Sequence, residues 1–163
     1  NGFGIRIDNP NEDRYRSNWH QDYPGNMRSI DGMVFWSPLV SIVPEIGPLD
    51  VCLGSHREGV FQYRTHDPSD PSRAGAYSLR LVDEEATVAR YRRASLLLEP
   101  GDLALVDYLN LHASGVNRSG RSRWSMQLRH FNYLDPVGQS MAWRGGYTDG
   151  VDVHALHPEI FVD

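Results

Sequence analysis

The segment Trp19–Tyr23 places a histidine and an aspartate two positions apart, as His20 and Asp22. In an extended segment, side chains at i and i+2 point to the same face, so both could reach one metal ion. Facial coordination by two histidines and one carboxylate leaves three positions open, which suits oxygen-activating iron(II). Taken alone, a His-x-Asp tripeptide is a weak signal, because it arises often by chance.

A third ligand would have to come from one of six other histidines. His112 lies just after the run Gly101–Asp107, at a predicted transition between strands where a ligand can project inward. His56 closes an apparent turn, which we expect it to stabilise. The remaining candidates lie in a polar loop, on a strand or in the C-terminal tail, namely His66, His130, His154 and His157.

The segment Arg123–Asn132 alternates between polar and apolar side chains. The odd positions are Arg123, Ser125, Gln127, Arg129 and Phe131, and the even ones are Trp124, Met126, Leu128 and His130. Because alternate residues of a strand face opposite sides, we expect the odd face to line a solvated cavity. The apolar even face should pack against a covering layer, with His130 pointing away from the metal site.

The composition limits the classes of protein that this chain can represent. Its 163 residues provide one domain, and a net charge of −5 argues against the basic face of a nucleic-acid binder. All 16 cationic residues are arginine, which excludes lysine Schiff-base chemistry. The single Cys52 cannot form an internal disulfide, and no apolar stretch reaches membrane-spanning length. We therefore expect a cytoplasmic protein without nucleic-acid or membrane partners; the sequence leaves its oligomeric state open.

Short runs of β-type residues separated by turn signals indicate an all-β sandwich or barrel, with few helices. The expected strands are 3–7, 33–39, 49–53, 96–98, 103–106 and 124–131. A helix-like stretch covers Asp83–Arg93, and residues 57–94 as a whole read as an inserted loop or lid. We expect a single domain over residues 1–163, which could lack an N-terminal segment because the chain opens almost directly into a strand.

Four phrases of the sequence occur together in a characteristic order. They are His20–Pro24, Gly47–His56, Pro100–Asp102 and His112–Gly115. In this order the chain resembles the phytanoyl-CoA dioxygenase-like family from about residue 1 to residue 133, with little matched between 57 and 94. The resemblance implies a double-stranded β-helix (jelly-roll, cupin-like) core that uses Fe(II), 2-oxoglutarate and O2. It also implies that His20, Asp22 and His112 are the metal ligands.

The resemblance further implies a co-substrate site. A family arginine eleven residues after the distal histidine binds the far carboxylate of 2-oxoglutarate, and that position here is Arg123. Ser125 would add a second donor, and the planar fork of an arginine suits a carboxylate. Trp36 and Ser114 resemble family residues beside the co-substrate. A core aromatic is an equally good interpretation of Trp36.

The activity implied is hydroxylation of an unactivated C–H bond of a small molecule, with release of succinate and CO2. Because Asp22 is present, halogenation is disfavoured. Side chains beyond the ligands and along the odd face are candidates for the substrate pocket, namely Tyr23, Met27, Arg28, Gln127, Arg129 and Phe131. The segment Trp143–Tyr147 could cover the cavity mouth or pack the tail against the barrel.

Two other functions remain open at this point. Two histidines and an aspartate can also form a catalytic zinc site, as in a hydrolase or isomerase on a cupin-like barrel. That alternative gives Arg123 and Ser125 no role. The second alternative is a jelly-roll binding module that has lost turnover.

Overall fold

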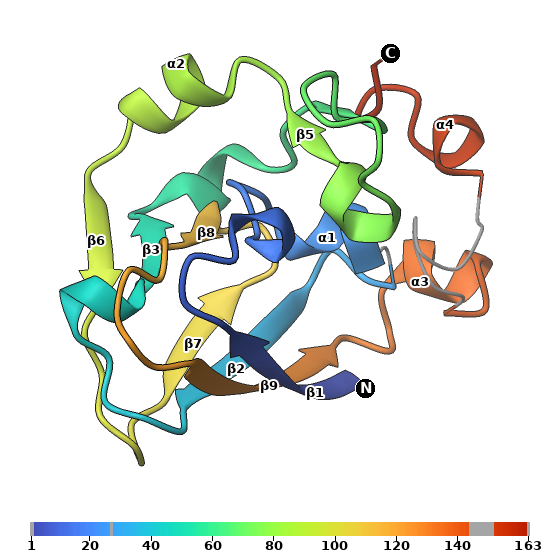
Figure 1. Ribbon diagram of the computed structural model, residues 1–163. Coiled ribbons are helices and arrows are strands. Elements are labelled where there is room, and N and C mark those ends of the chain that lie inside the picture. The colour runs from blue at the N-terminus through green and yellow to red at the C-terminus, as the bar shows by residue number, and fades with distance from the viewer. Residues whose placement is uncertain (1, 27, 144–151, 163) are drawn as a thin grey trace.

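The computed structural model describes residues 2–26, 28–143 and 152–162, and its backbone is dominated by antiparallel strands (Figure 1). The strands are β1 (Gly2–Asp8), β2 (Gly32–Pro38), β3 (Leu49–Cys52), β4 (Tyr63–Arg64), β5 (Arg80–Leu81), β6 (Arg93–Leu96), β7 (Ala104–Asp107), β8 (His112–Ser114) and β9 (Arg123–Phe131). The α-helices are α1 (Asp22–Asn26), α2 (Glu84–Ala89), α3 (Pro136–Ser140) and α4 (Val153–Leu156). Short 3-10 turns cover Asp13–Tyr15, Pro44–Ile46, Ser55–Glu58 and Gly75–Ser78.

Two sheets form the framework. The larger has the strand order β1-β9-β2-β7, and the smaller has the order β6-β3-β8. All pairings within them are antiparallel. This arrangement confirms the predicted all-β architecture. Five of the expected strands lie within two residues of observed ones; the sixth, 96–98, is displaced toward the C-terminus relative to β6.

The inner face of the larger sheet forms one wall of the core. In β2 the side chains of Val34 and Trp36 are buried, and Val106 of β7 lies beside them. Leu49 and Val51 of β3 are buried in the opposing sheet. Between them stand residues that are less buried, as period-two patterning requires of a strand with one buried face.

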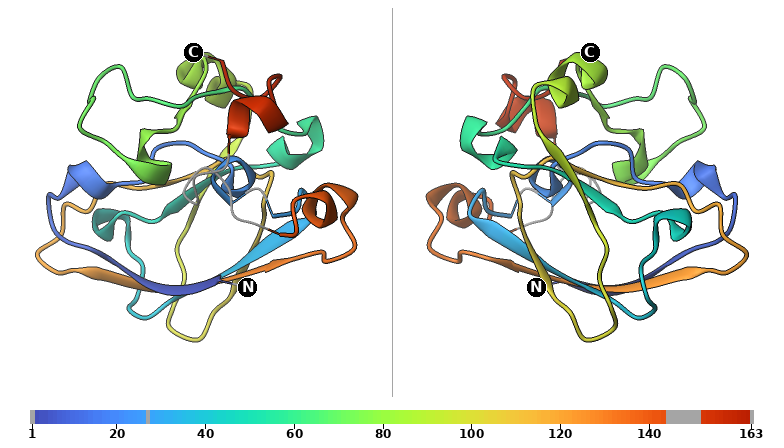
Figure 2. Two further views of the ribbon diagram at one scale, coloured as in Figure 1. Left: turned by 90° about the vertical axis from the view of Figure 1, so that its right-hand side faces the viewer. Right: turned by 90° about the vertical axis from the view of Figure 1, so that its left-hand side faces the viewer.

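The outer face of the larger sheet is apolar and exposed. Phe3 and Ile5 of β1 are 85% and 63% exposed, Leu105 of β7 is 57% exposed, and Trp124 of β9 is 41% exposed. The even-numbered side chains of β9 therefore point away from the interior, as expected. The predicted covering layer is absent from the described part of the chain, and Figure 2 shows the helices gathered on the other side of this sheet.

The segment between β3 and β6 is more structured than the loop predicted for residues 57–94. It contains the β4–β5 pair and helix α2, in which Val88 is buried as the helical pattern suggested. Tyr63 of β4 is fully buried. Within the described residues, no helix is long and apolar enough to cross a membrane.

Candidate metal centre

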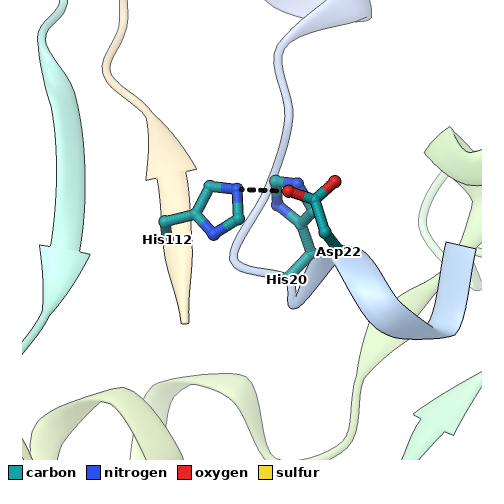
Figure 3. A group of neighbouring side chains, drawn as sticks. All are labelled: His20, Asp22 and His112. Carbon is teal, nitrogen blue, oxygen red and sulfur yellow. Dashed lines mark ion pairs between the residues drawn. The ribbon is translucent and has the colours of Figure 1, made fainter. Parts of the chain in front are cut away.

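His20, Asp22 and His112 come together in the interior, although 90 residues separate Asp22 from His112 in the chain (Figure 3). One potential ligand atom from each residue lies within 4.8 Å of the others. The Nε2 atom of His112 is 3.6 Å from Oδ2 of Asp22, and the two imidazole centroids are 4.2 Å apart. Such spacing allows all three side chains to bind one ion.

The backbone fixes the two histidines against each other. His20 and His112 form an isolated antiparallel bridge, in which each amide donates to the other's carbonyl at 3.0 Å. Asp22 does not continue an extended segment, as the i, i+2 argument assumed. It is the first residue of α1, so a turn into that helix brings its carboxylate back beside His20. Pro24 and Gly25, which follow at once, are consistent with this turn.

Backbone carbonyls hold both imidazole rings in the same way. Nδ1 of His20 lies 2.7 Å from the carbonyl oxygen of Asn18, and Nδ1 of His112 lies 2.8 Å from that of Asn110. In a neutral imidazole, an Nδ1–H that donates to a carbonyl leaves the Nε2 lone pair for a metal. Both rings are therefore oriented for coordination through Nε2.

Electrostatics favour at His20 and Asp22 the protonation states that a cation requires. Burial lowers the pKa of His20 to about 4, with a further contribution from His112, so the ring is neutral at pH 7. Burial opposes ionisation of Asp22, but the positive charge of Arg129 outweighs it and lowers the pKa of this carboxyl group. A carboxylate beside two imidazoles is a suitable donor set for a divalent metal.

One oxygen of Asp22 lacks a partner. Arg129 Nε donates to Oδ1 at 3.3 Å, whereas Oδ2 is buried and accepts no hydrogen bond within the described residues. A buried carboxylate oxygen without a donor is costly, because its desolvation is not compensated. A metal ion between Asp22 and the histidines would compensate it, and the three side chains fit such an ion.

Gln21 holds the segment between the two ligands, a role that the sequence analysis missed. Its side chain is buried; Nε2 donates to the carbonyls of Gly59 and Leu109, and Oε1 accepts from the amide of Phe61. Its own amide donates to the hydroxyl of Tyr63. In the sequence, the one signal of this role is the position of Gln21 between two candidate ligands. If both ligands face the metal, the side chain between them faces the opposite side of the segment.

A second polar group lies around Arg123 at the end of the interior bounded by β1, β8 and β9. Arg123 is 2% exposed and donates from Nη2 to Ser114 Oγ at 3.2 Å and from Nη1 to the carbonyl of Gly47. A positive φ of 77° lets Gly47 approach Gly115 so closely that a Cβ would lie 2.5 Å from its carbonyl oxygen. Ser125 Oγ is buried and has no hydrogen-bond partner in the described structure.

Asp8 is the counter-ion of this buried guanidinium. Its Oδ2 accepts from Nη2 of Arg123 at 2.7 Å, and its carboxylate also pairs with Arg6 at 2.7 Å. The two guanidiniums outweigh burial and lower the pKa of Asp8. Sequence analysis missed both residues, although the alternation of Arg6 and Asp8 with Ile5 and Ile7 signals that they face inward.

Two chambers open onto the triad. The inner one, of about 60 Å³, is lined by all three candidate ligands and by side chains of both sheets, including Trp36, Leu49, Ser114, Gln127 and Arg129. The outer one, of about 220 Å³, shares His20, Asp22, Arg6, Ser17 and Arg129 with it and extends toward the β3–β6 segment. The triad thus lies between an enclosed space and a larger one.

The sequence profile of phytanoyl-CoA dioxygenase (PhyH) matches residues 8–125, well over half of the chain, and this stretch includes the whole triad. The chain belongs to the phytanoyl-CoA dioxygenase family. Enzymes of the family depend on Fe(II) and 2-oxoglutarate. Among the described residues, the triad offers donors that could bind a metal ion. No curated protein sequence matches the chain.

Solved structures with the same fold include non-haem enzymes that depend on 2-oxoglutarate. EvdO2 from Micromonospora carbonacea var. aurantiaca is 23% identical with a TM-score of 0.58, the match covering 83% of this chain and 56% of EvdO2. The 2-oxoglutarate-dependent carbocyclase SnoK from nogalamycin biosynthesis is 17% identical with a TM-score of 0.63, covering 96% and 54%. The epimerase SnoN from the same biosynthesis is 17% identical with a TM-score of 0.53, covering 85% and 50%. This chain spans about half the length of the structures it matches.

Of the four residues predicted to lie beside the co-substrate, two line the inner chamber and two lie farther from it. Trp36 and Ser114 line the inner chamber, and Trp36 is also 3% exposed and part of the core. Arg123 and Ser125 line neither chamber and lie behind Ser114. Both interpretations of Trp36, as a core aromatic and as a cavity wall, therefore describe its position.

Five of the six candidate substrate residues are described, and they divide into those that line a chamber and those that do not. Gln127 lines the inner chamber and Arg129 lines both. Tyr23 lies in the core with its hydroxyl 2.9 Å from Nε2 of His157, and it lines neither chamber. Phe131 and Arg28 are not among the lining residues, and Met27 lies outside the described residues.

The remaining candidates lie away from the triad. His130 is exposed and packs edge-on against Phe35 on the outer face of the larger sheet, as parity predicted. His66 and His154 are exposed, and His56 belongs to the turn after β3. In the segment Trp143–Tyr147, only Trp143 is described, and its ring lies 5.8 Å from that of Tyr133. The other residues of that segment lie outside the described structure.

Proposed function

We propose that this chain is the catalytic core of an Fe(II)- and 2-oxoglutarate-dependent oxygenase that hydroxylates an unactivated C–H bond of a small molecule. His20, Asp22 and His112 would hold the iron, which when bound supplies the oxygen chemistry. Succinate and CO2 are the expected co-products. The observation that carries the proposal is the triad, in which two imidazoles are fixed for coordination and the buried Oδ2 of Asp22 has no hydrogen-bond partner among the described residues.

The polar group around Arg123 supports a site for the far carboxylate of 2-oxoglutarate. Its Nε–Nη2 edge is engaged by Asp8, and Nη1 already donates to the carbonyl of Gly47, so a second carboxylate would have to approach the edge between Nη1 and Nη2 and the serines. Ser114 Oγ lies at this edge, and the buried hydroxyl of Ser125 has no partner. These donors offer the charge-assisted hydrogen bonds that such an anion needs.

The β3–β6 segment supports the idea of a lid over the substrate. Tyr63, Arg73, Tyr77 and Leu79 come from this segment and line the outer chamber. We infer that the substrate occupies this chamber, while the co-substrate occupies the inner one. A cytoplasmic location, a single domain over residues 1–163 and a small-molecule substrate remain predictions of the same account.

The residues that line the two chambers favour the oxygenase over the zinc hydrolase. Among the described residues, the only carboxylate that lines either chamber is Asp22, which is itself a candidate ligand. A hydrolase that activates water through zinc normally uses a separate general base close to the metal. The carbocyclase and the epimerase have a similar fold but catalyse different reactions, so the fold alone does not determine the type of reaction.

Succinate formation under air tests the proposal. Purified chain supplied with Fe(II) and 2-oxoglutarate should release succinate above the protein-free rate, and Zn(II) should not replace Fe(II). His112→Ala should abolish the release, whereas His130→Ala, which removes an exposed imidazole on the opposite face of β9, should leave it unchanged. Equal release by wild type and His112→Ala would refute the assignment.

A further inference from the structure

The wall of the outer chamber is rich in arginine. Four guanidiniums line it, contributed by Arg6, Arg16, Arg73 and Arg129, and the only lining carboxylate in the described structure is Asp22. Leu79 and the rings of Tyr63 and Tyr77 supply apolar surface. Such an excess of positive charge in a partly desolvated space attracts anions more strongly than the same charges would in bulk water.

Arg6 and Arg129 already have structural partners. Arg6 pairs with Asp8, and Arg129 holds Oδ1 of Asp22 and donates to Gln127. Asp8 is shared with Arg123, so its one negative charge faces two guanidiniums.

Arg16 has no ionic partner in the part of the chain that the structure describes. Its Nη1 donates to the carbonyl of Ser114 at 3.1 Å, and its Nη2 donates to Oδ1 of Asn18 at 3.3 Å. Both acceptors are neutral. Glu84 is close enough for a Coulombic interaction but does not form an ion pair with Arg16. The half-buried charge of Arg16 is therefore available to a ligand in the chamber.

Arg73 presents donors without acceptors. Its side chain is 12% exposed, and Nε and Nη1 are buried with no hydrogen bond in the described structure. Its ionic contacts are long, at 3.5 Å to Asp67 and 3.6 Å to Asp70, and Asp67 is also shared with Arg80. Buried guanidinium donors without partners are costly unless an acceptor reaches them.

We propose that the substrate carries an anionic group, a carboxylate or a tetrahedral oxyanion, which Arg16 and Arg73 bind in the outer chamber. The inference rests on the proposed function, because it takes this chamber as the substrate site. The anion would anchor the far end of the substrate and direct its other end toward the triad. At about 220 Å³ the chamber suits a compact metabolite.

Calorimetric titration of protein loaded with Ni(II) and saturating 2-oxoglutarate tests the proposal, with sulfate and acetate as probes. Saturation with 2-oxoglutarate keeps the probes away from Arg123, and Ni(II) avoids oxygen chemistry. We expect Arg16→Gln and Arg73→Gln each to weaken probe binding about ten-fold or more. Arg93→Gln, an exposed arginine of β6 that lines neither chamber, should change nothing. Arg73→Lys keeps the charge and should bind better than Arg73→Gln.

A higher affinity for sulfate than for acetate would indicate that the substrate carries a tetrahedral oxyanion. A higher affinity for acetate would indicate a carboxylate. Absence of probe binding would overturn the proposal, as would equal weakening by Arg93→Gln or binding that disappears when 2-oxoglutarate is added. If no 2-oxoglutarate binds but both arginines still control sulfate binding, the anion site stands and the proposed function fails. Unfolding midpoints of all variants distinguish loss of binding from loss of folding; should Arg73→Gln not fold, Arg16→Gln and Arg73→Lys carry the test.

Discussion

The carboxylate of Asp8 allows the guanidinium of Arg123 to be buried, and it is at the same time paired with Arg6. A buried guanidinium without a counter-ion is strongly unfavourable, so removing the charge of Asp8 should cost more than an ordinary salt bridge contributes. The ion pair between Asp8 and Arg123 also orients this arginine, which we propose binds 2-oxoglutarate.

Asp8→Asn should therefore lower the free energy of unfolding by roughly 3 kcal/mol at pH 7, because it leaves Arg123 buried without a counter-ion. The pKa of Asp8 is lowered in the folded chain, so its contribution is present above the unfolded value of about 4 and is lost as the pH falls through the folded pKa. Urea unfolding at pH 7 and at stepwise lower pH values measures both effects.

The matched control is Asp13→Asn, which breaks the exposed pair between Asp13 and Arg118, whose side chains are each about half exposed. Exposed pairs contribute little, so this variant should unfold close to wild type. Equal losses for the two variants, or a difference between wild type and Asp8→Asn that persists unchanged into acid, would show that Asp8 is not the counter-ion of Arg123.

Among the elements, the segment from His20 to α1 is the most demanding to predict. The His-x-Asp spacing singled out His20 and Asp22 as candidate ligands, but the extended geometry assumed for it was wrong, since Asp22 begins a helix. β8 was not predicted because it has only three residues, His112–Ser114, with no β-rich run. Its place is set by pairing with β3 and by the bridge to His20, which are long-range contacts that a local pattern does not contain.

The parts that could be predicted have strong local signals. The alternation in β9 gave the correct facing of Arg123, Ser125 and His130, because a strand with one buried face repeats every two residues. The larger strands of both sheets were found in the same way. By contrast, the contacts of Gln21 and Asp8 depend on which strands and loops become neighbours in the fold. Residues 57–94 were predicted as an inserted loop because of their length, so the strands and the helix within them were underestimated.

Gln21→Leu tests how the ligand segment is held. The change removes hydrogen bonds to Gly59, Leu109 and Phe61 and leaves those buried backbone groups without partners, so the free energy of unfolding should fall by roughly 3 kcal/mol. Affinity for Ni(II) should fall about ten-fold or more, because the ligands lose their support. Gln139→Leu, at an exposed glutamine of α3, should alter neither urea unfolding nor calorimetric Ni(II) binding.

A wild-type metal affinity in Gln21→Leu would mean that the bridge between His20 and His112 alone positions the ligands. Wild-type stability would mean that water replaces the lost hydrogen bonds. Either result would limit Gln21 to one of the two roles.

At the scale of the whole molecule, the two faces of the larger sheet differ. The inner face carries the polar side chains of the two chambers, and the outer face exposes a continuous apolar surface over β1, β9, β2 and β7. Cross-strand neighbours such as Ile5 with Met126 and Phe35 with Leu105 make this surface continuous. An exposed apolar area of this kind promotes association and dye binding.

The isolated chain should therefore enhance the fluorescence of a hydrophobic dye and associate as its concentration rises. The double variant Ile5→Thr/Leu105→Thr should reduce both effects without lowering the free energy of unfolding, since these side chains are 63% and 57% exposed. Leu53→Thr, an exposed leucine that follows β3 of the other sheet, is the control. Dye binding that is unchanged in the double variant would place the apolar contact elsewhere.

The most direct test of the central claim is an anaerobic titration of the Fe(II)-loaded chain with 2-oxoglutarate, followed by its visible charge-transfer band. We predict a band in wild type and in His130→Ala, no band in His112→Ala, and a requirement for at least about ten-fold more 2-oxoglutarate in Arg123→Ala. Absence of the band from folded, iron-loaded wild type would contradict the account.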